Sequence, residues 1–142
     1  MSKCICLDSS VIIKILTWEE KSDKAVALFN RVLENNYNVL LPDFAWAEIG
    51  SVLRKKVRCG ILKENEAFTL WEAFANINNI QFIHCNEIWE RTWDISNRED
   101  LPTLYDAAFI AVCEVYKINE FWTADLKLLN SLSNNWDFVK EL

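Results

Sequence analysis

The stretch Lys3-Cys4-Ile5-Cys6-Leu7-Asp8-Ser9-Ser10-Val11 decides the fold of this chain. Its first part is a short apolar run typical of a buried parallel strand, and it leads directly into a carboxylate and two hydroxyls. Open α/β sheets carry their functional groups at the carboxyl ends of the strands, which makes Asp8 a candidate site residue. Asp8 alone also fits a simple helix cap, because a short polar side chain satisfies the free N–H groups of a helix that begins near Val11.

The composition is that of an ordinary globular protein. The chain has 142 residues, 51% hydrophobic and 25% charged, and this length predicts a single domain over residues 1–142. No apolar run approaches the ~20 residues that cross a bilayer, and the N-terminus has no signal-peptide pattern, so we expect a cytoplasmic protein without membrane contact. The net charge of −6 excludes a uniformly basic surface but not a local basic patch beside an acidic site.

The cysteines and the histidine do not indicate a zinc or disulfide framework. The five cysteines are scattered, at positions 4, 6, 59, 85 and 113, and are best interpreted as reduced, packed thiols. With one histidine in the chain, a zinc site lacks ligands. That residue, His84, has no identified partner in the sequence, so we interpret it as structural rather than as a catalytic base.

Strand-like and helix-like segments alternate along the whole chain. Only two glycines and two prolines occur, which predicts long regular elements and short connections. The predicted strands cover residues 3–7, 37–41, 80–83, 120–123 and, at an edge, 137–139. The predicted helices cover residues 11–16, 19–35, 43–58, 63–78, 87–97, 104–116 and 126–131. This alternation predicts an α/β domain with a parallel sheet of four to five strands flanked by helices.

Parallel topology brings acidic residues from distant segments to one edge of the sheet. Asp8 ends the first strand and Asp125 follows the fourth, and neighbouring strands lie about 5 Å apart. Glu48 lies on the helix that leaves the second strand at that edge, and Asp106 begins the most apolar helix. Each of them singly also fits a cap, a helix-dipole partner or a surface residue. Together in one cleft they would repel one another, and such oxygen-rich anionic sites bind Mg²⁺ or Mn²⁺.

Four short motifs follow one another along the chain: Leu7-Asp8-Ser9-Ser10, Ala47-Glu48, Tyr105-Asp106-Ala107-Ala108 and Thr123-Ala124-Asp125-Leu126. In this order and spacing they resemble the PIN-domain ribonuclease family, and within it the VapC-type toxins of prokaryotic toxin–antitoxin pairs. The resemblance covers essentially the whole chain. It implies a three-layer α/β/α sandwich with strand order 3-2-1-4-5 and metal-dependent cleavage of RNA at the carboxyl edge of the sheet. It also implies an antitoxin that inhibits from the catalytic groove, and toxins of this kind often form homodimers.

The same resemblance implies roles for the acidic residues. Asp8, Glu48, Asp106 and Asp125 would form the catalytic quartet. Asp8, Asp106 and Asp125 would hold Mg²⁺ or Mn²⁺, as one ion or two, directly or through water. Glu48 would either complete the metal shell or act as general base on a bound water.

Three hydroxyls accompany these carboxylates. Thr123 would orient a carboxylate or a metal-bound water, and Ser9 and Ser10 are further candidates for this supporting role. With Asp8 assigned to the metal, we expect Ser9 or Ser10 to cap the helix that follows.

An RNA-cleaving site also needs positive charge near the cleft. The best candidates are Arg54, Lys55, Lys56 and Arg58, at the end of the Glu48 helix, although they equally fit a solvated helix end that complements the helix dipole. The seven tryptophans are expected mostly in the core or in grooves, where exposed ones would offer a surface to a partner. The weaker candidates for RNA contact are Arg98 and Lys127.

Other classes of function fit less well. A phosphate-transferring enzyme with an aspartate after the first strand would need Asp-x-Asp, and Ser10 stands at the second position. A dinucleotide-binding domain needs Gly-x-Gly-x-x-Gly, which glycines at 50 and 60 cannot form. Two alternatives stay open: a PIN-like binding module without nuclease activity, and a housekeeping PIN nuclease that has no antitoxin.

Overall fold

The computed structural model describes residues 3–142, and its sheet has five parallel strands in the order β3-β2-β1-β4-β5. The order is the one that the resemblance implied, and every predicted strand forms. The edge strand lies slightly later than predicted, because it pairs along β4 from Val139 to Glu141. The strands are β1 (Cys4–Leu7), β2 (Asn38–Pro42), β3 (Ile80–Ile83), β4 (Phe121–Thr123) and β5 (Val139–Glu141).

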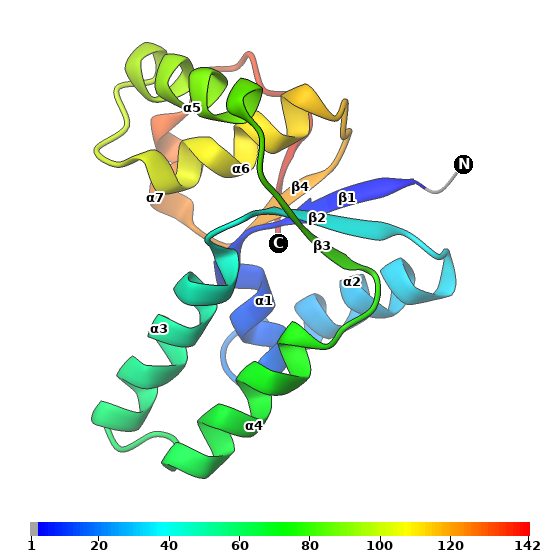
Figure 1. Cartoon of the computed structure of the whole chain (residues 1–142), viewed down its shortest axis with the longest axis vertical. Coiled ribbons are helices and arrows are strands. Elements are labelled where there is room, and N and C mark those ends of the chain that lie inside the picture. The colour runs from blue at the N-terminus through cyan, green and yellow to red at the C-terminus, as the bar shows by residue number, and fades with distance from the viewer. Residues whose placement is uncertain (1–2) are drawn as a thin grey trace.

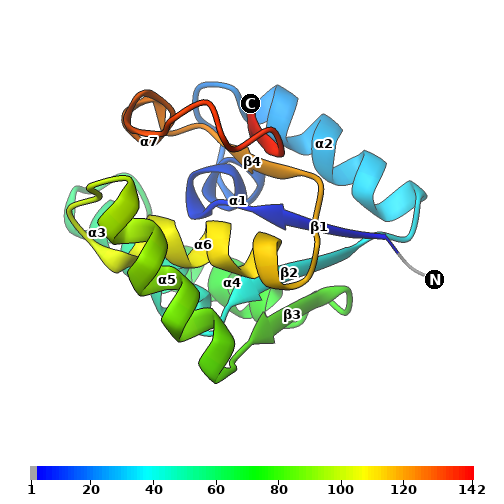
Figure 2. The same ribbon diagram turned by 90° about the horizontal axis from the view of Figure 1, so that it is seen from above.

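Helices cover both faces of this sheet. Figure 1 shows α5 and α6 on one side of the strands and α1 to α4 on the other, the arrangement that right-handed crossovers produce. Figure 2, seen from above, shows β1 running between α1 and α6. The predicted α/β/α layering is therefore confirmed. The helices are α1 (Ser9–Leu16), α2 (Ser22–Glu34), α3 (Ala45–Arg58), α4 (Glu64–Ala75), α5 (Asn86–Arg98), α6 (Leu104–Val115) and α7 (Leu126–Ser131).

The central strand and the helix above it form the core. Ile5, Cys6 and Leu7 are buried, as a strand covered on both faces requires. Helix α6 is buried from Ala107 to Cys113, and its Phe109 stacks on Phe121 of β4 with ring centroids 5.8 Å apart. Each such side chain contributes about 1.5–3 kcal/mol of apolar burial. This packing holds the end of β1, and with it the start of α1, in a fixed place.

Helix α2 begins at Ser22 rather than at residue 19, which corrects the predicted boundary. The buried Ser22 hydroxyl donates to the Thr17 carbonyl at 3.0 Å and accepts from the Glu19 N–H at 2.8 Å. Lys21 then takes a left-handed backbone with φ of 66° before the helix starts. Glu19 therefore lies in the turn between α1 and α2 that the Ser22 hydroxyl holds together, outside both helices.

Helices α3 and α4 form a hairpin that extends away from the sheet (Figure 1). The end of α3 is closed by Gly60, whose φ of 75° is the left-handed conformation that glycine favours. Its N–H donates to the Val57 carbonyl at 3.0 Å. Among residues 3–142, none of the helices has the length and hydropathy that crossing a membrane requires.

Candidate active site

All four predicted acidic residues line one cavity of about 390 Å³. Asp8 follows β1 and Asp125 follows β4, and these strands pair in parallel with Leu7 beside Trp122. Glu48 and Asp106 lie in the first turns of α3 and α6. Four segments that are distant in sequence thus deliver their carboxylates to one edge of the sheet.

Asp8 is the most enclosed of the four, with 5% of its surface exposed. One oxygen, Oδ2, accepts hydrogen bonds from the Ser10 hydroxyl at 2.7 Å and the Thr123 hydroxyl at 2.8 Å. The other oxygen, Oδ1, accepts from the Ser9 N–H at 2.9 Å. Asp8 is therefore held on both oxygens by the start of α1 and the end of β4.

The expectation that Ser9 or Ser10 caps α1 is wrong, because Asp8 is the N-cap residue. Its backbone is extended, with φ −63° and ψ 154°, which is the conformation that a cap requires. Ser9 and Ser10 already belong to the helix, so their hydroxyls are available for other contacts. Capping and membership of the acidic cluster are thus two roles of one carboxylate rather than alternatives.

The supporting hydroxyls are oriented by the backbone that follows β4. The Thr123 Oγ1 accepts from the Asp125 N–H at 3.0 Å, and the Ser10 Oγ accepts from the Ala124 N–H at 3.1 Å. Because each oxygen already accepts a bond from an amide, each hydroxyl proton is directed to Asp8. Asp125 in turn caps α7, accepting from two N–H groups of that helix. The site is therefore braced across β1 and β4.

Ser9 supports a different carboxylate. Its hydroxyl donates to Oε1 of Glu48, which joins the first turn of α1 to the first turn of α3. Ser9 is 8% exposed and Glu48 is half-buried, so this contact is largely screened from solvent. The three hydroxyls thus divide between Asp8 and Glu48.

Burial and mutual repulsion raise the pKa of three of these carboxyls, those of Asp8, Glu48 and Asp106. Burial raises the pKa of Asp106, and the nearby Asp8, Asp125 and Glu48 raise it further, to about 6. Burial also raises the pKa of Asp8 and that of Glu48, although hydrogen bonds from the neighbouring hydroxyls limit both increases. The negative charge of the four acids is therefore only partly compensated within the cavity.

The acidic residues fit a divalent cation in charge and donor type. Their ligand atoms are all carboxylate oxygens, which hard cations such as Mg²⁺ and Mn²⁺ prefer, and a cation would relieve the repulsion that raises the pKa of Asp106. Among residues 3–142, however, no three side chains of histidine, cysteine, aspartate or glutamate are close enough to form a ready-made metal cage. The fit is therefore one of chemistry rather than of preformed geometry.

The raised pKa of Asp106 predicts a pH dependence of stability. Between pH 3.8 and about 6 the folded carboxyl binds more protons than the unfolded one, so the free energy of unfolding should fall as the pH rises through this window. The full difference corresponds to about 3 kcal/mol, which solvent screening of a half-buried group reduces to roughly 1–2 kcal/mol. We therefore expect the free energies of unfolding of metal-free wild type and Asp106→Asn to separate as the pH rises from 3.8 to about 6, with the variant more stable at pH 7. Denaturant unfolding at a series of pH values measures this difference. Equal stabilities at every pH would contradict it.

Two lysines and a further glutamate also line the cavity, in addition to the four predicted acids. Lys14, Glu19 and Lys56 line it together with the four acids. Of these, sequence reasoning named only Lys56. Helical spacing is the signal that could have found Lys14, since it lies one turn after Ser10 on α1. Glu19 lies in the turn after that helix, and no pattern in the sequence indicates it.

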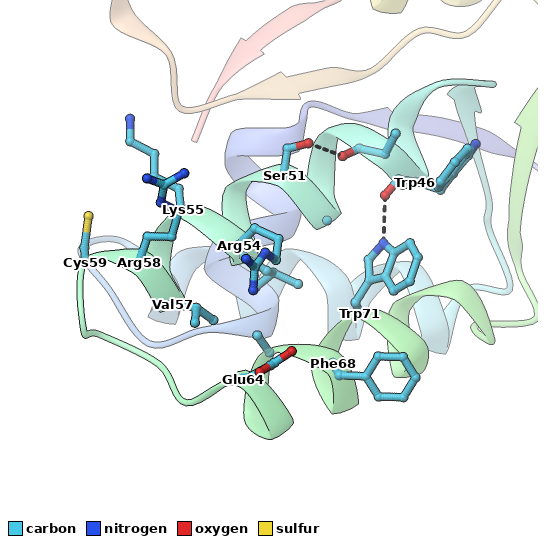
Figure 3. Close-up of a pocket in the computed structure, with 14 residues that line it drawn as sticks. Trp46, Ser51, Arg54, Lys55, Val57, Arg58, Cys59, Glu64, Phe68 and Trp71 are labelled. Carbon is cyan, nitrogen blue, oxygen red and sulfur yellow. Dashed lines mark hydrogen bonds between the residues drawn. The ribbon is translucent and has the colours of Figure 1, made fainter.

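The predicted basic run is divided by the structure. Lys56 faces the acidic cavity, whereas Arg54, Lys55 and Arg58 line a separate groove of about 970 Å³ between α3 and α4. Figure 3 shows this groove, with Trp46 and Trp71 at one end and the basic side chains at the other. The Trp71 indole N–H donates to the Trp46 carbonyl at 2.8 Å.

The remaining candidates are not among the residues that line the acidic cavity. Arg98 is 3.4 Å from Asp94 and packs over the ring of Trp136, and Lys127 is exposed on α7. His84 pairs with Asp43 at 2.6 Å, in an aromatic groove of about 540 Å³ that Trp89 and Trp93 also line. Of the seven tryptophans only Trp136 is buried, and several of the others line grooves.

The strand order and the acidic cavity at the carboxyl edge define a three-layer α/β protein of the PIN type. The chain belongs to the PIN domain family, whose family model matches residues 5–131. No curated protein sequence matches the chain.

Solved structures with the same fold include proteins of toxin–antitoxin systems. VapC20 from Mycobacterium tuberculosis, described as a sarcin-ricin loop cleaving toxin, is 18% identical with a TM-score of 0.65, over 88% of this chain and 94% of that one. A protein in a toxin–antitoxin complex from Klebsiella pneumoniae is 16% identical with a TM-score of 0.64, over 96% of this chain and 95% of that one. A chain of VapBC2 from Rickettsia felis, bound to a promoter DNA fragment, is 9% identical with a TM-score of 0.70, over 97% of this chain and 98% of that one. At these identities the likeness is one of fold.

Proposed function

We propose that this protein is a metal-dependent endoribonuclease that acts in the cytoplasm as the toxin of a type II toxin–antitoxin pair. The observation that carries the proposal is the acidic cavity, in which Asp8, Glu48, Asp106 and Asp125 meet at the carboxyl edge of the sheet. Burial, and then repulsion from the other three acids, raises the pKa of Asp106 to about 6, and a bound cation would offset that repulsion.

In this proposal Asp8, Asp106 and Asp125 hold Mg²⁺ or Mn²⁺, directly or through water. The bound cation would supply a water of lowered pKa and would offset negative charge on the scissile phosphate. Asp8 is already oriented for its part, because Ser10 and Thr123 donate to one of its oxygens. These hydroxyls keep the carboxylate from turning away when the site is empty of substrate.

Glu48 has a separate place in the cavity. Its carboxylate is half-buried, and burial raises its pKa, the direction that favours a group that takes a proton from the attacking water. The Ser9 hydroxyl donates to Oε1 and leaves Oε2 for that task. Service as a further metal ligand is the other role, and a Glu48→Gln variant that still binds Mn²⁺ but does not cleave would assign the base.

The toxin assignment rests on the PIN domain family and on the fold shared with VapC20 and with two toxin–antitoxin complexes. We therefore propose a cognate antitoxin as partner, and the resemblance to VapC-type toxins, which often form homodimers, adds a homodimer to the proposal. A housekeeping PIN nuclease would share the cavity without the partner. Co-expression with the product of the neighbouring reading frame distinguishes the two, because only an antitoxin would co-purify with the protein and suppress its cleavage of RNA.

The activity is tested with purified protein and a labelled single-stranded RNA. We expect cleavage in Mg²⁺ or Mn²⁺ and none in EDTA. Calorimetric titration with Mn²⁺ should show binding that Asp106→Asn weakens by about tenfold or more, since one anionic ligand is lost. Absence of both cleavage and metal binding would contradict the nuclease proposal and favour a PIN-like binding module.

A further inference from the structure

A carboxylate bridges two lysines within the lining of the acidic cavity. Lys14 Nζ lies 3.1 Å from Oε2 of Glu19, and Lys56 Nζ lies 3.3 Å from Oε1 of the same side chain. The Thr17 hydroxyl lies 3.2 Å from Oε1, but its single proton has a closer acceptor in the Ile13 carbonyl at 2.9 Å, so the lysines are the main partners of this carboxylate. The lysine side chains are only 13% and 19% exposed. This is a built, partly buried ion pair rather than a chance surface contact.

The two lysines are the only cationic side chains among the described residues that line this cavity. Around them stand Glu19 and the four acids of the site, so the cavity is strongly negative when all are ionised. A polyanion that reaches the acids must gain its attraction from these lysines or from a bound cation. Yet in the free protein both lysines are occupied by Glu19.

A carboxylate and a phosphodiester present the same feature to a pair of ammonium groups, namely two anionic oxygens a short distance apart. Glu19 uses one oxygen for each lysine, which is how a backbone phosphate would use its two non-bridging oxygens. Glu19 lies in the turn between α1 and α2, beside the 80% exposed Trp18. Its side chain can therefore leave without any movement of a helix.

We propose that Lys14 and Lys56 form a binding site for a phosphate of the RNA backbone, and that Glu19 is an internal mimic which that phosphate displaces. The proposal rests on the proposed function in that the substrate is RNA. Since one anion replaces another, the lysines keep a partner throughout, and the exchange weakens binding relative to free lysines. Glu19 thus restrains the site until a nucleic acid chain provides competing charge.

Fluorescence anisotropy of a labelled single-stranded RNA, measured in EDTA so that no cleavage occurs, tests the exchange. Glu19→Gln keeps the size and shape of the side chain but removes the charge, and we expect the Kd of this variant for RNA to fall about tenfold, the value of one charge-assisted hydrogen bond. Lys14→Met and Lys56→Met keep the alkyl stem, and we expect each to raise Kd by about tenfold. Each lysine variant should also reduce the slope of log K against log salt by about 0.7.

Matched controls separate this site from a general change of charge. Glu20→Gln removes the same charge from the exposed neighbouring residue, and Lys24→Met removes a lysine from the exposed face of α2. We expect both to bind RNA within about twofold of wild type. Thermal melts show whether each variant is folded, and only folded variants enter the comparison. If Glu19→Gln matches Glu20→Gln, or if both lysine variants match Lys24→Met, the phosphate-binding pair is wrong.

Cleavage in Mn²⁺ keeps this inference separate from the proposed function. If wild type cleaves RNA but the variants at positions 14, 19 and 56 behave like the controls, the proposed nuclease function is supported and the phosphate site at Lys14 and Lys56 is contradicted. If wild type does not cleave RNA but the differences in RNA binding appear, the nuclease function is contradicted and the phosphate site at Lys14 and Lys56 is supported. If both hold, Glu19→Gln should lower KM about as much as it lowers Kd, with kcat little changed.

Discussion

Asp8→Asn should reduce RNA cleavage by at least about 1,000-fold while leaving the protein folded. Asp8 is the most enclosed acid of the cavity, and the Ser10 and Thr123 hydroxyls both donate to its Oδ2. Asparagine keeps the shape and still caps α1 through its carbonyl oxygen, because asparagine and aspartate are equally good N-caps. It removes the charge, and it places an amide N–H₂ where Oδ2 accepts from the Ser10 and Thr123 hydroxyls, which can accept in turn through their second lone pairs.

The stability of this variant should move in the opposite direction to its activity. Burial and Asp125 raise the pKa of Asp8, so a neutral side chain relieves repulsion, and the metal-free variant should melt at or above the wild-type temperature. Mn²⁺ at about 100 times its Kd should stabilise wild type by about 2.7 kcal/mol and should stabilise the variant far less. Asp137→Asn, on the exposed surface before β5, is the control with the same chemical change. Undiminished cleavage by Asp8→Asn would contradict the metal-site role.

Thr123→Val should lose both stability and activity, although valine has nearly the shape of threonine. Thr123 is fully buried, and its hydroxyl donates to Asp8 and accepts from the Asp125 N–H. Valine leaves that N–H without its partner, which costs about 1–3 kcal/mol in the free energy of unfolding. The loss of a group that orients a ligand should lower kcat/KM by about 10–100-fold.

The pH profile distinguishes an orienting role from a merely structural one. Because the Thr123 hydroxyl lowers the pKa of Asp8, its removal should shift the acidic limb of the activity profile to higher pH. Thr123→Ser keeps the hydroxyl and loses a methyl group, at about 0.8 kcal/mol, and it should retain the wild-type profile. A Thr123→Val profile identical to that of wild type would show that the residue only fills space.

Much of the architecture was predictable from local patterns. The apolar run before Asp8 indicated a strand buried on both faces, and the helical spacing of apolar residues located every helix to within a few residues. Parallel topology then placed Asp8 and Asp125 at one edge, since both follow paired strands in the same direction. The predicted start of α2 at residue 19 was wrong because the Ser22 hydroxyl bonds the backbone of the preceding turn, a side-chain contact that no periodicity in the sequence indicates.

The sequence by itself therefore determined the order of strands and helices and the edge of the sheet where the acids gather. It did so because burial imposes periods of two and 3.6 residues on the chain, and these periods are visible without contacts. Only the tertiary structure decided that Asp8 both caps α1 and accepts from Thr123, that Lys56 parts from Arg54 and Arg58, and that Glu19 bridges two lysines in the acidic cavity. These are contacts between distant segments, and their partners are set by how helices and strands pack rather than by any spacing along the chain.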